Sequence, residues 1–269
     1  VVFFIFLVAN IGGSLTPLGD PPLFLGFLKG VDFFWTTKAM FMPMLFMVTS
    51  LMIIFYLYDS FMYKKEESIP MPDGDEKFGI KGSFNLLLIA GVVCSVLISG
   101  FWRPGIEFTL YHVHVELQNL TRDVLLLILA FASLKLTPSE IREANEFNWF
   151  PIQEVAKLFA GIFITIIPAI AILKAGNDGA LSAVINAVSS EAGPVNSMYF
   201  WLTGILSSFL DNAPTYLVFF NTAGGDAQVL MGELSNTLLA ISAGAVFMGA
   251  NTYIGNAPNF MVKSIAESS

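Results

Sequence analysis

The chain has 269 residues, of which 55% are hydrophobic and only 13% are charged, and its net charge is −8. A soluble domain carries about 25% charged residues, so this composition excludes an ordinary soluble protein. The acidic balance provides no basic surface for nucleic acid, and the single cysteine excludes an intrachain disulfide. We therefore expect an all-α, polytopic membrane protein whose main partner is the lipid bilayer.

Apolar stretches in chain order predict the membrane spans. A first crossing ends near residue 28, and residues 36–58 and 84–102 are each close to the roughly 20 residues that a span requires. A polar loop at 59–83 separates these two stretches. Residues 124–136 are short for a span without their flanks, 139–157 resemble an amphipathic surface helix, and 159–173 form a span kinked at Pro168. We expect one transporter domain, with the end of a first repeat at 1–58, spans and a connector at 84–158, and a second repeat at 159–269.

Two segments of the chain repeat one another. Residues 13–24 and 249–260 share five identical positions when aligned, and the alignment places Asp20 on Asn256. Unwound backbone at membrane depth is tolerated only against protein or a wet cavity, and paired breaks of this kind mark the binding sites of secondary transporters. The residues expected to break the helices are Gly13, Gly19, Gly249, Gly255 and Pro258.

A third break lies within residues 199–221, at the sequence SSFLDNAPT (207–215). The apolar arms on either side are too short to cross a bilayer singly, which favours a re-entrant hairpin over one kinked span. With a hairpin, an even number of crossings separates the two repeated segments, and they form an inverted repeat. With a kinked span, the two segments would instead run parallel.

Acidic and amide side chains at these breaks are the candidate transport residues. Asp211 lies inside an apolar run, where an acidic residue costs about 2.5–3.5 kcal/mol and is a functional-site candidate by default. Side-chain oxygens and freed carbonyls beside Pro214 suit sodium or lithium, and a buried carboxylate also suits exchange of a proton. The alternative is that Asp211 and Asn212 only cap a broken helix. The candidate ion-binding residues are Asp211, Asn212, Thr215, Ser208, Asp20, Thr16, Asn10, Thr252, Asn251 and Asn256, with Asn259 as a further ligand.

No other cluster indicates a cofactor or a resident metal. His112 and His114 alternate in a polar loop, but a metal site requires three or four ligands and no clear third one is present. We expect no metal beyond the transported cation and no cofactor.

Several motifs resemble the ion transporter superfamily, in the branch of NhaD-type sodium/proton antiporters and arsenite exporters. They are NIGG at residues 10–13, TPLGDPP at 16–22, FNW at 147–149 before EVA at 154–156, LDNAPT at 210–215, and GNAPN at 255–259. The resemblance implies an inverted-repeat fold with two re-entrant hairpins and two broken helices, alternating access and a homodimer. It also places a first hairpin upstream of Thr16, so we expect this chain to be a fragment lacking its N-terminal hairpin.

The function expected from the motifs is sodium/proton antiport by a multi-pass protein of the plasma (inner) membrane. An arsenite or organic-anion carrier shares the fold, but Asp20 and Asp211 would repel an anion unless cations bind first. An intramembrane aspartyl protease would need a second aspartate, for which Asp59 is the candidate. We expect a transporter and not an enzyme.

Overall fold

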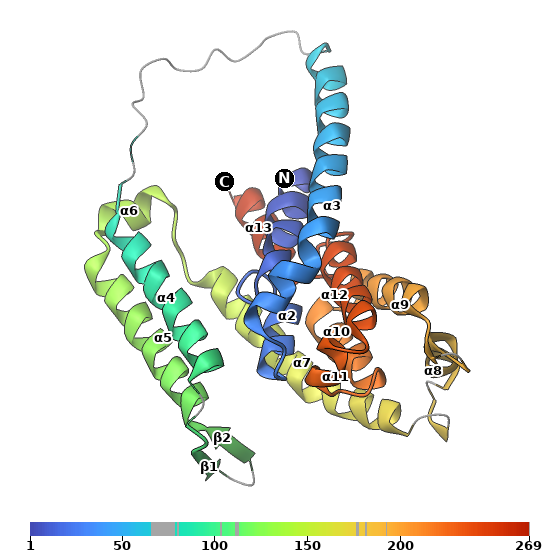
Figure 1. Ribbon diagram of the computed structural model, residues 1–269. Helices are drawn as coiled ribbons and strands as arrows, with labels where there is room; N and C mark the ends of the chain where they lie inside the picture. Colours follow the sequence, from blue (N-terminus) through green and yellow to red (C-terminus); the bar gives the residue numbers. More distant parts are fainter. Residues whose placement is uncertain are drawn as a thin grey trace. The chain divides into compact units, whose positions relative to one another are not determined.

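The computed structural model describes residues 1–65, 79, 81–102, 104–110, 113–175, 178–180, 182–191 and 193–268 (Figure 1). Two compact units divide the chain: Val1–Lys65 together with Trp149–Ser269, and Glu66–Asn148. The first unit contains α1 (Val2–Phe4), η1 (Ile5–Asn10), η2 (Ile11–Leu15), α2 (Pro21–Leu28), α3 (Phe33–Tyr63), α7 (Phe150–Lys174), α8 (Ser182–Val188), β3 (Ser189–Ser190), β4 (Gly193–Pro194), α9 (Asn196–Phe209), α10 (Asn212–Thr222), α11 (Ala227–Met231), α12 (Ser235–Gly249) and α13 (Ala257–Ser268). The second contains α4 (Phe84–Phe101), β1 (Glu107–Leu110), β2 (Val113–Glu116), α5 (Leu117–Leu136) and α6 (Ser139–Ala144).

Helices dominate the described residues, which confirms the prediction of an all-α membrane protein. Three of them, α3, α4 and α5, are long and apolar enough to cross a bilayer. Their apolar side chains face outward, as lipid contact requires: Phe46 and Tyr56 on α3 are each 70% exposed. Within the described ranges, the strands form two short antiparallel hairpins, β1–β2 and β3–β4.

The flanks of the apolar run at 124–136 complete a span, as the sequence requires: α5 begins at Leu117 and ends at Leu136. Two other sequence predictions need correction. The expected surface helix at 139–157 is not continuous. Helix α6 ends at Ala144, just before the left-handed backbone of Glu146 (φ 50°), and α7 begins afresh at Phe150. The polar loop expected from residue 59 starts later, since α3 continues to Tyr63, and residues 66–78 and 80 of that loop lie outside the described ranges.

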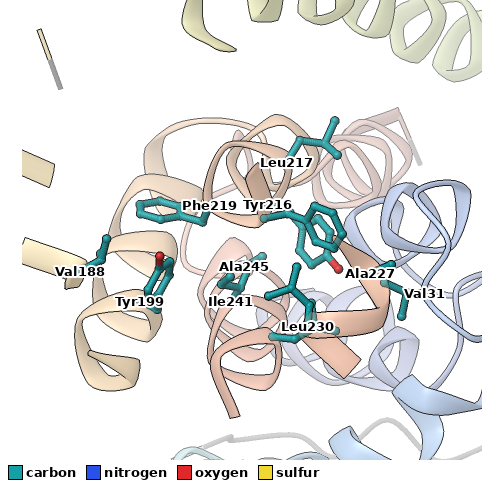
Figure 2. Packing of buried hydrophobic residues seen from close by; sticks show 12 residues of the cluster. Val31, Val188, Tyr199, Tyr216, Leu217, Phe219, Ala227, Leu230, Ile241 and Ala245 are labelled. Atoms are coloured by element: carbon teal, nitrogen blue, oxygen red, sulfur yellow. The ribbon is translucent and has the colours of Figure 1, made fainter. Parts of the chain in front are cut away.

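Helices α9 and α10 fold back on one another around the break at Leu210 and Asp211. The rings of Tyr199, near the start of α9, and Phe219, near the end of α10, lie 6.2 Å apart in an edge-to-face arrangement (Figure 2). In one kinked helix these two residues would be separated by about 30 Å at 1.5 Å per residue. The prediction of a helical hairpin, rather than a kinked span, is therefore confirmed for the α9–α10 segment.

Buried apolar side chains join the hairpin to α11 and α12. Tyr216, Phe219 and Phe220 of α10 pack with Leu230 of α11 and Ile241 of α12, and none of them is more than 1% exposed (Figure 2). Glycines allow α9 and α12 to approach closely, because a Cβ at Gly244 would lie 2.5 Å from the Phe200 carbonyl oxygen. This core holds the hairpin tip against the second repeated segment.

The first repeated segment is held by local helix signals. Asp32 caps α3 by accepting a hydrogen bond from Phe34 N at 2.9 Å. Gly30, at φ 101°, ends α2 in a conformation that favours glycine. The hydroxyls of Thr36 and Thr37 both donate to the Leu15 carbonyl, at 3.2 and 2.7 Å, so α3 braces the end of η2.

Candidate functional site

The two repeated segments adopt similar local conformations. In the first, Gly13 and Gly19 face each other so closely that a Cβ on either would overlap the other's carbonyl oxygen. In the second, a Cβ at Gly255 would lie 2.5 Å from the carbonyl oxygen of Gly249. A turn hydrogen bond closes each loop. In the first, Gly19 N donates to Thr16 O at 3.0 Å, and in the second, Gly255 N donates to Thr252 O at 3.4 Å. The glycines predicted to interrupt the helices thus lie where backbone contacts backbone.

Each break is followed at once by a new helix, and the residue before that helix is the aligned polar one. Asp20 precedes α2 and Asn256 precedes α13, while Asp211 precedes α10 of the hairpin. Pro21 opens α2 at a position where its missing N–H costs nothing. Three helix N-termini, which carry partial positive charge, therefore begin at the residues that the sequence singled out.

Asp20 is the centre of a buried polar cluster. Its side chain is only 2% exposed, and its Oδ1 accepts hydrogen bonds from Asn212 Nδ2 at 3.0 Å and from Asn256 Nδ2 at 3.3 Å. The same Asn256 nitrogen donates to Asn10 Oδ1 at 2.9 Å. The cluster thus joins the first break, the hairpin tip and the second break through one carboxylate. The residues that these hydrogen bonds connect lie about 190 to 250 positions apart in the sequence.

Asn10 and Asn259 extend the cluster into the backbone. Asn10 Nδ2 donates to the Ile5 carbonyl at 2.9 Å, within the π-helical turn of η1, and also to Asn259 Oδ1. Asn259 Nδ2 in turn donates to the carbonyls of Gly249 and Thr252, each at 2.9 Å. These are carbonyls that the helix break deprives of intrahelical donors, so Asn259 stabilises the unwound conformation.

At the hairpin tip, one oxygen of Asp211 caps the start of α10. Asp211 Oδ1 accepts from Ala213 N at 3.0 Å, so the capping alternative holds for this atom. Thr215 Oγ1 donates to the Asp211 carbonyl at 3.0 Å. Asn212 N donates to the Gly255 carbonyl at 2.9 Å, which ties the tip to the second break.

Four buried oxygens around this junction accept no hydrogen bond from any donor in the described part of the chain. They are Asp20 Oδ2, Asp211 Oδ2, Asn212 Oδ1 and Asn256 Oδ1. The Asp211 carboxylate also acts electrostatically on Asp20. Among the residues that the structure describes, no Lys or Arg side chain forms an ion pair with either carboxylate. An arrangement of unpartnered oxygens with net negative charge is one that a cation or a proton can satisfy.

Other predicted residues lie beside the cluster rather than in it. Ser208 Oγ donates to the Gly204 and Met248 carbonyls at 2.9 Å each and accepts from Asn251 Nδ2 at 2.9 Å. Thr252 Oγ1 donates to the Ser208 carbonyl at 2.6 Å. These contacts fasten α9 to the second break. The Thr16 hydroxyl, which is half-buried, makes no hydrogen bond within the described residues.

Asn259 contributes more to the site than its place in the sequence predicts. Its one sequence signal is its position three residues after Asn256, which places it in the first turn of α13, close to the residue that precedes the helix. His112 lies outside the described ranges, and His114 Nδ1 is 3.3 Å from Thr109 Oγ1. Within the described part of the chain, no group of three or more His, Cys, Asp or Glu side chains is placed to hold a metal ion.

Comparison with known proteins gives one result. The chain matches, over residues 1–269, a family described as "Putative citrate transport". No curated protein and no solved structure matches it. The match agrees with the resemblance to the ion transporter superfamily, identifies a multi-pass membrane transporter rather than an enzyme, and gives no support to the protease alternative.

Proposed function

The chain belongs to the CitMHS_2 family of membrane transporters, and from that premise we propose that it is a cation-coupled secondary transporter. In this proposal Asp20, Asp211, Asn212 and Asn256 bind the coupling cation, sodium or a proton, and the cargo is an organic anion of the citrate type. The two partners would cross the membrane together by alternating access.

The observation that carries the proposal is the set of four unpartnered buried oxygens. Leaving a buried acceptor unsatisfied costs about 1–3 kcal/mol each, which is a large cost unless a ligand completes the site. Carboxylate and amide oxygens are hard ligands of the kind that sodium prefers in broken-helix sites. A proton on one carboxylate would satisfy part of the same set and remove the repulsion between Asp20 and Asp211.

An organic anion fits this arrangement only when a cation is present. Asp20 and Asp211 repel a free carboxylate, whereas the N-termini of α2, α10 and α13 attract one. A bound cation offsets the aspartates and leaves the helix termini to act on the anion. Coupling then follows from electrostatics, because each ligand improves the site for the other.

Sodium/proton antiport is the second candidate. The observation in its favour is that, in the described part of the chain, neither carboxylate has a basic partner, so sodium and protons could compete for one acidic site without any anion. In such a mechanism Asp20 or Asp211 would carry the proton in one direction and sodium in the other. An arsenite carrier would be an anion-type variant of the first candidate.

The test is transport by the full-length protein in proteoliposomes, with labelled citrate uptake and a pH-sensitive dye recorded under sodium and proton gradients. We expect citrate uptake that depends on a cation gradient. Asp20→Asn should reduce it by about tenfold or more, since a charge-assisted contact is worth about 1.5–3 kcal/mol. The matched control is Asp178→Asn, which removes an exposed carboxylate.

The results separate the candidates. Citrate uptake that does not depend on the sodium or the proton gradient contradicts the cation-coupled carrier. Citrate uptake that Asp20→Asn leaves unchanged contradicts it as well. Sodium-triggered proton flux without citrate, lost in Asp20→Asn, identifies the antiporter instead. Arsenite uptake in place of citrate uptake would identify the arsenite variant.

A further inference from the structure

A cavity opens between α4 and α5, two helices that are long and apolar enough to span the bilayer (Figure 1). Its volume is about 430 Å³, within the roughly 300–1,000 Å³ typical of small-molecule sites. All of its lining residues lie on α4, on α5 or in the segment around α6, within one compact unit of the chain. Ile89, on its wall, is 58% exposed, so the cavity is open on a side that faces lipid.

The cavity runs along the spans rather than across them. On α4 its lining extends from Asn85, the second residue of the helix, to Val92. On α5 it extends from Leu126 to Leu134, close to the end of the helix at Leu136. At 1.5 Å per residue each wall is roughly 10–12 Å long, so the cavity reaches from the ends of the spans into the hydrocarbon region.

The polar lining residues lie where the spans end. Asn85 is in the first turn of α4, Thr137 directly follows α5, and Arg142 lies on α6. Arg142 Nη1 donates to the Leu134 carbonyl at 2.8 Å, which holds the guanidinium beside the last turn of α5. Thr137 Oγ1 donates to Asn85 Oδ1 at 2.8 Å, so this contact leaves the amide N–H groups of Asn85 for a ligand.

Arg142 supplies the charge of this cavity. Within the described ranges no carboxylate forms an ion pair with it, and the bond to Leu134 engages one of the five N–H donors of a guanidinium. Its acidic neighbours on α6, Glu140 and Glu143, are exposed and do not line the cavity. A guanidinium binds a phosphate through two parallel hydrogen bonds, and basic pockets between membrane helices bind lipid headgroups.

We propose that this cavity binds a membrane phospholipid. Arg142 and Asn85 bind its phosphate at the end of the spans, and one acyl chain lies along the apolar walls of α4 and α5. Polar lining residues at the headgroup level and apolar ones at greater depth follow the order of the groups in such a lipid. The proposal does not depend on the cargo, because the cavity and the Asp20 cluster belong to different compact units.

Binding of dipalmitoyl phosphatidylglycerol to the full-length protein, purified in detergent and freed of lipid, tests the proposal. Native mass spectrometry counts the bound lipid, and a titration gives its dissociation constant. Arg142→Met should raise that constant by about tenfold or more, the effect of losing one charge-assisted contact. Lys135→Met is the matched control, because it removes an exposed positive charge from the last turn of α5 without altering the cavity lining.

Dipalmitoyl glycerol, which has the same chains and no phosphate, separates the two parts of the site. Its dissociation constant for the wild type should be higher than that of the phospholipid by about tenfold or more, and Arg142→Met should leave it unchanged. Equal affinity for the two lipids overturns the assignment of the phosphate to Arg142. An equal loss of phospholipid affinity in Lys135→Met overturns it too, because it would indicate a general attraction to basic residues.

A variant at the apolar end does not depend on the arginine variant folding. Ala130 lines the cavity, so Ala130→Phe places a ring in the volume that the acyl chain would occupy. This change should weaken phospholipid binding several-fold. Ala90→Phe is the control, because Ala90 is exposed on α4 and lies outside the cavity lining. Unchanged affinity in Ala130→Phe contradicts the proposal.

A second copy of the chain is the competing occupant of this cavity. Cys94 is the only cysteine, so Ala130→Cys in a Cys94→Ser background carries a single thiol on the cavity wall. Treatment of membranes with a short bifunctional maleimide should leave this protein uncross-linked, because lipid and not protein covers residue 130. Dimers cross-linked through residue 130 would overturn the lipid site.

Discussion

Gly255 lies where two backbone segments meet, and its replacement by alanine tests the second helix break directly. A Cβ at this position would lie 2.5 Å from the Gly249 carbonyl oxygen and 2.6 Å from the Ser207 carbonyl oxygen. Both neighbours are backbone atoms, so neither can rotate away as a flexible side chain would. The break must open to admit the methyl group.

The expected cost combines two effects. Overpacking a close contact costs about 1–3 kcal/mol. Opening the break also weakens the hydrogen bond from Asn212 N to Gly255 O, which is 2.9 Å long and worth about 0.5–1.5 kcal/mol. We therefore expect Gly255→Ala to lose about 2–4 kcal/mol of unfolding free energy, and to loosen the hairpin tip.

The assay is thermal unfolding of the full-length protein in detergent, followed by tryptophan fluorescence. Gly161→Ala is the control, because a Cβ there meets nothing within 4 Å, and alanine in a helix interior gains about 0.5–1 kcal/mol over glycine. A Gly255→Ala protein within about 0.5 kcal/mol of wild type, the range of ordinary surface substitutions, would contradict a tight backbone contact at this position.

Two further predictions concern the same region. Asn259→Leu removes the donor to two carbonyls of the second break and should lower the free energy of unfolding by about 2–5 kcal/mol in the same assay. The control, Asn236→Leu, replaces an exposed side chain and should change stability little. Equal effects of the two substitutions would contradict the role of Asn259 in stabilising the break. Gly26→Ala places a methyl group against the Tyr216 hydroxyl and should cost about 1–3 kcal/mol. Adding Tyr216→Phe should recover part of that loss, measured as a coupling in a double-mutant cycle, and strict additivity of the two changes would exclude the contact.

Some elements were predictable because their signals are local. The apolar run at 84–102 predicted α4, and the run at 36–58 predicted the body of α3. The ends were harder to predict, since α3 continues through Asp59 to Tyr63 and α5 begins seven residues before the apolar run at 124–136. Helix ends depend on capping and on polar side chains finding partners, which hydropathy does not measure.

The candidate site was partly predictable for a similar reason. Asp20, Asn256 and Asp211 stand out because ionisable and amide groups beside helix breakers are costly in apolar sequence. Their different roles did not follow from residue type. Asp211 uses one oxygen as a cap, while Ser208 fastens two helices together instead of facing the cluster.

An all-α membrane protein with duplicated helix breaks follows from the sequence alone, because composition and repeated glycines are local properties of the chain. The packing of the helices brings Asn212 and Asn256 onto Asp20, joins Asn10 to them through Asn256, and sets Asn259 against the second break. The reason is physical: the breaks leave backbone and side-chain groups without local partners, and which distant groups satisfy them depends on how the helices pack.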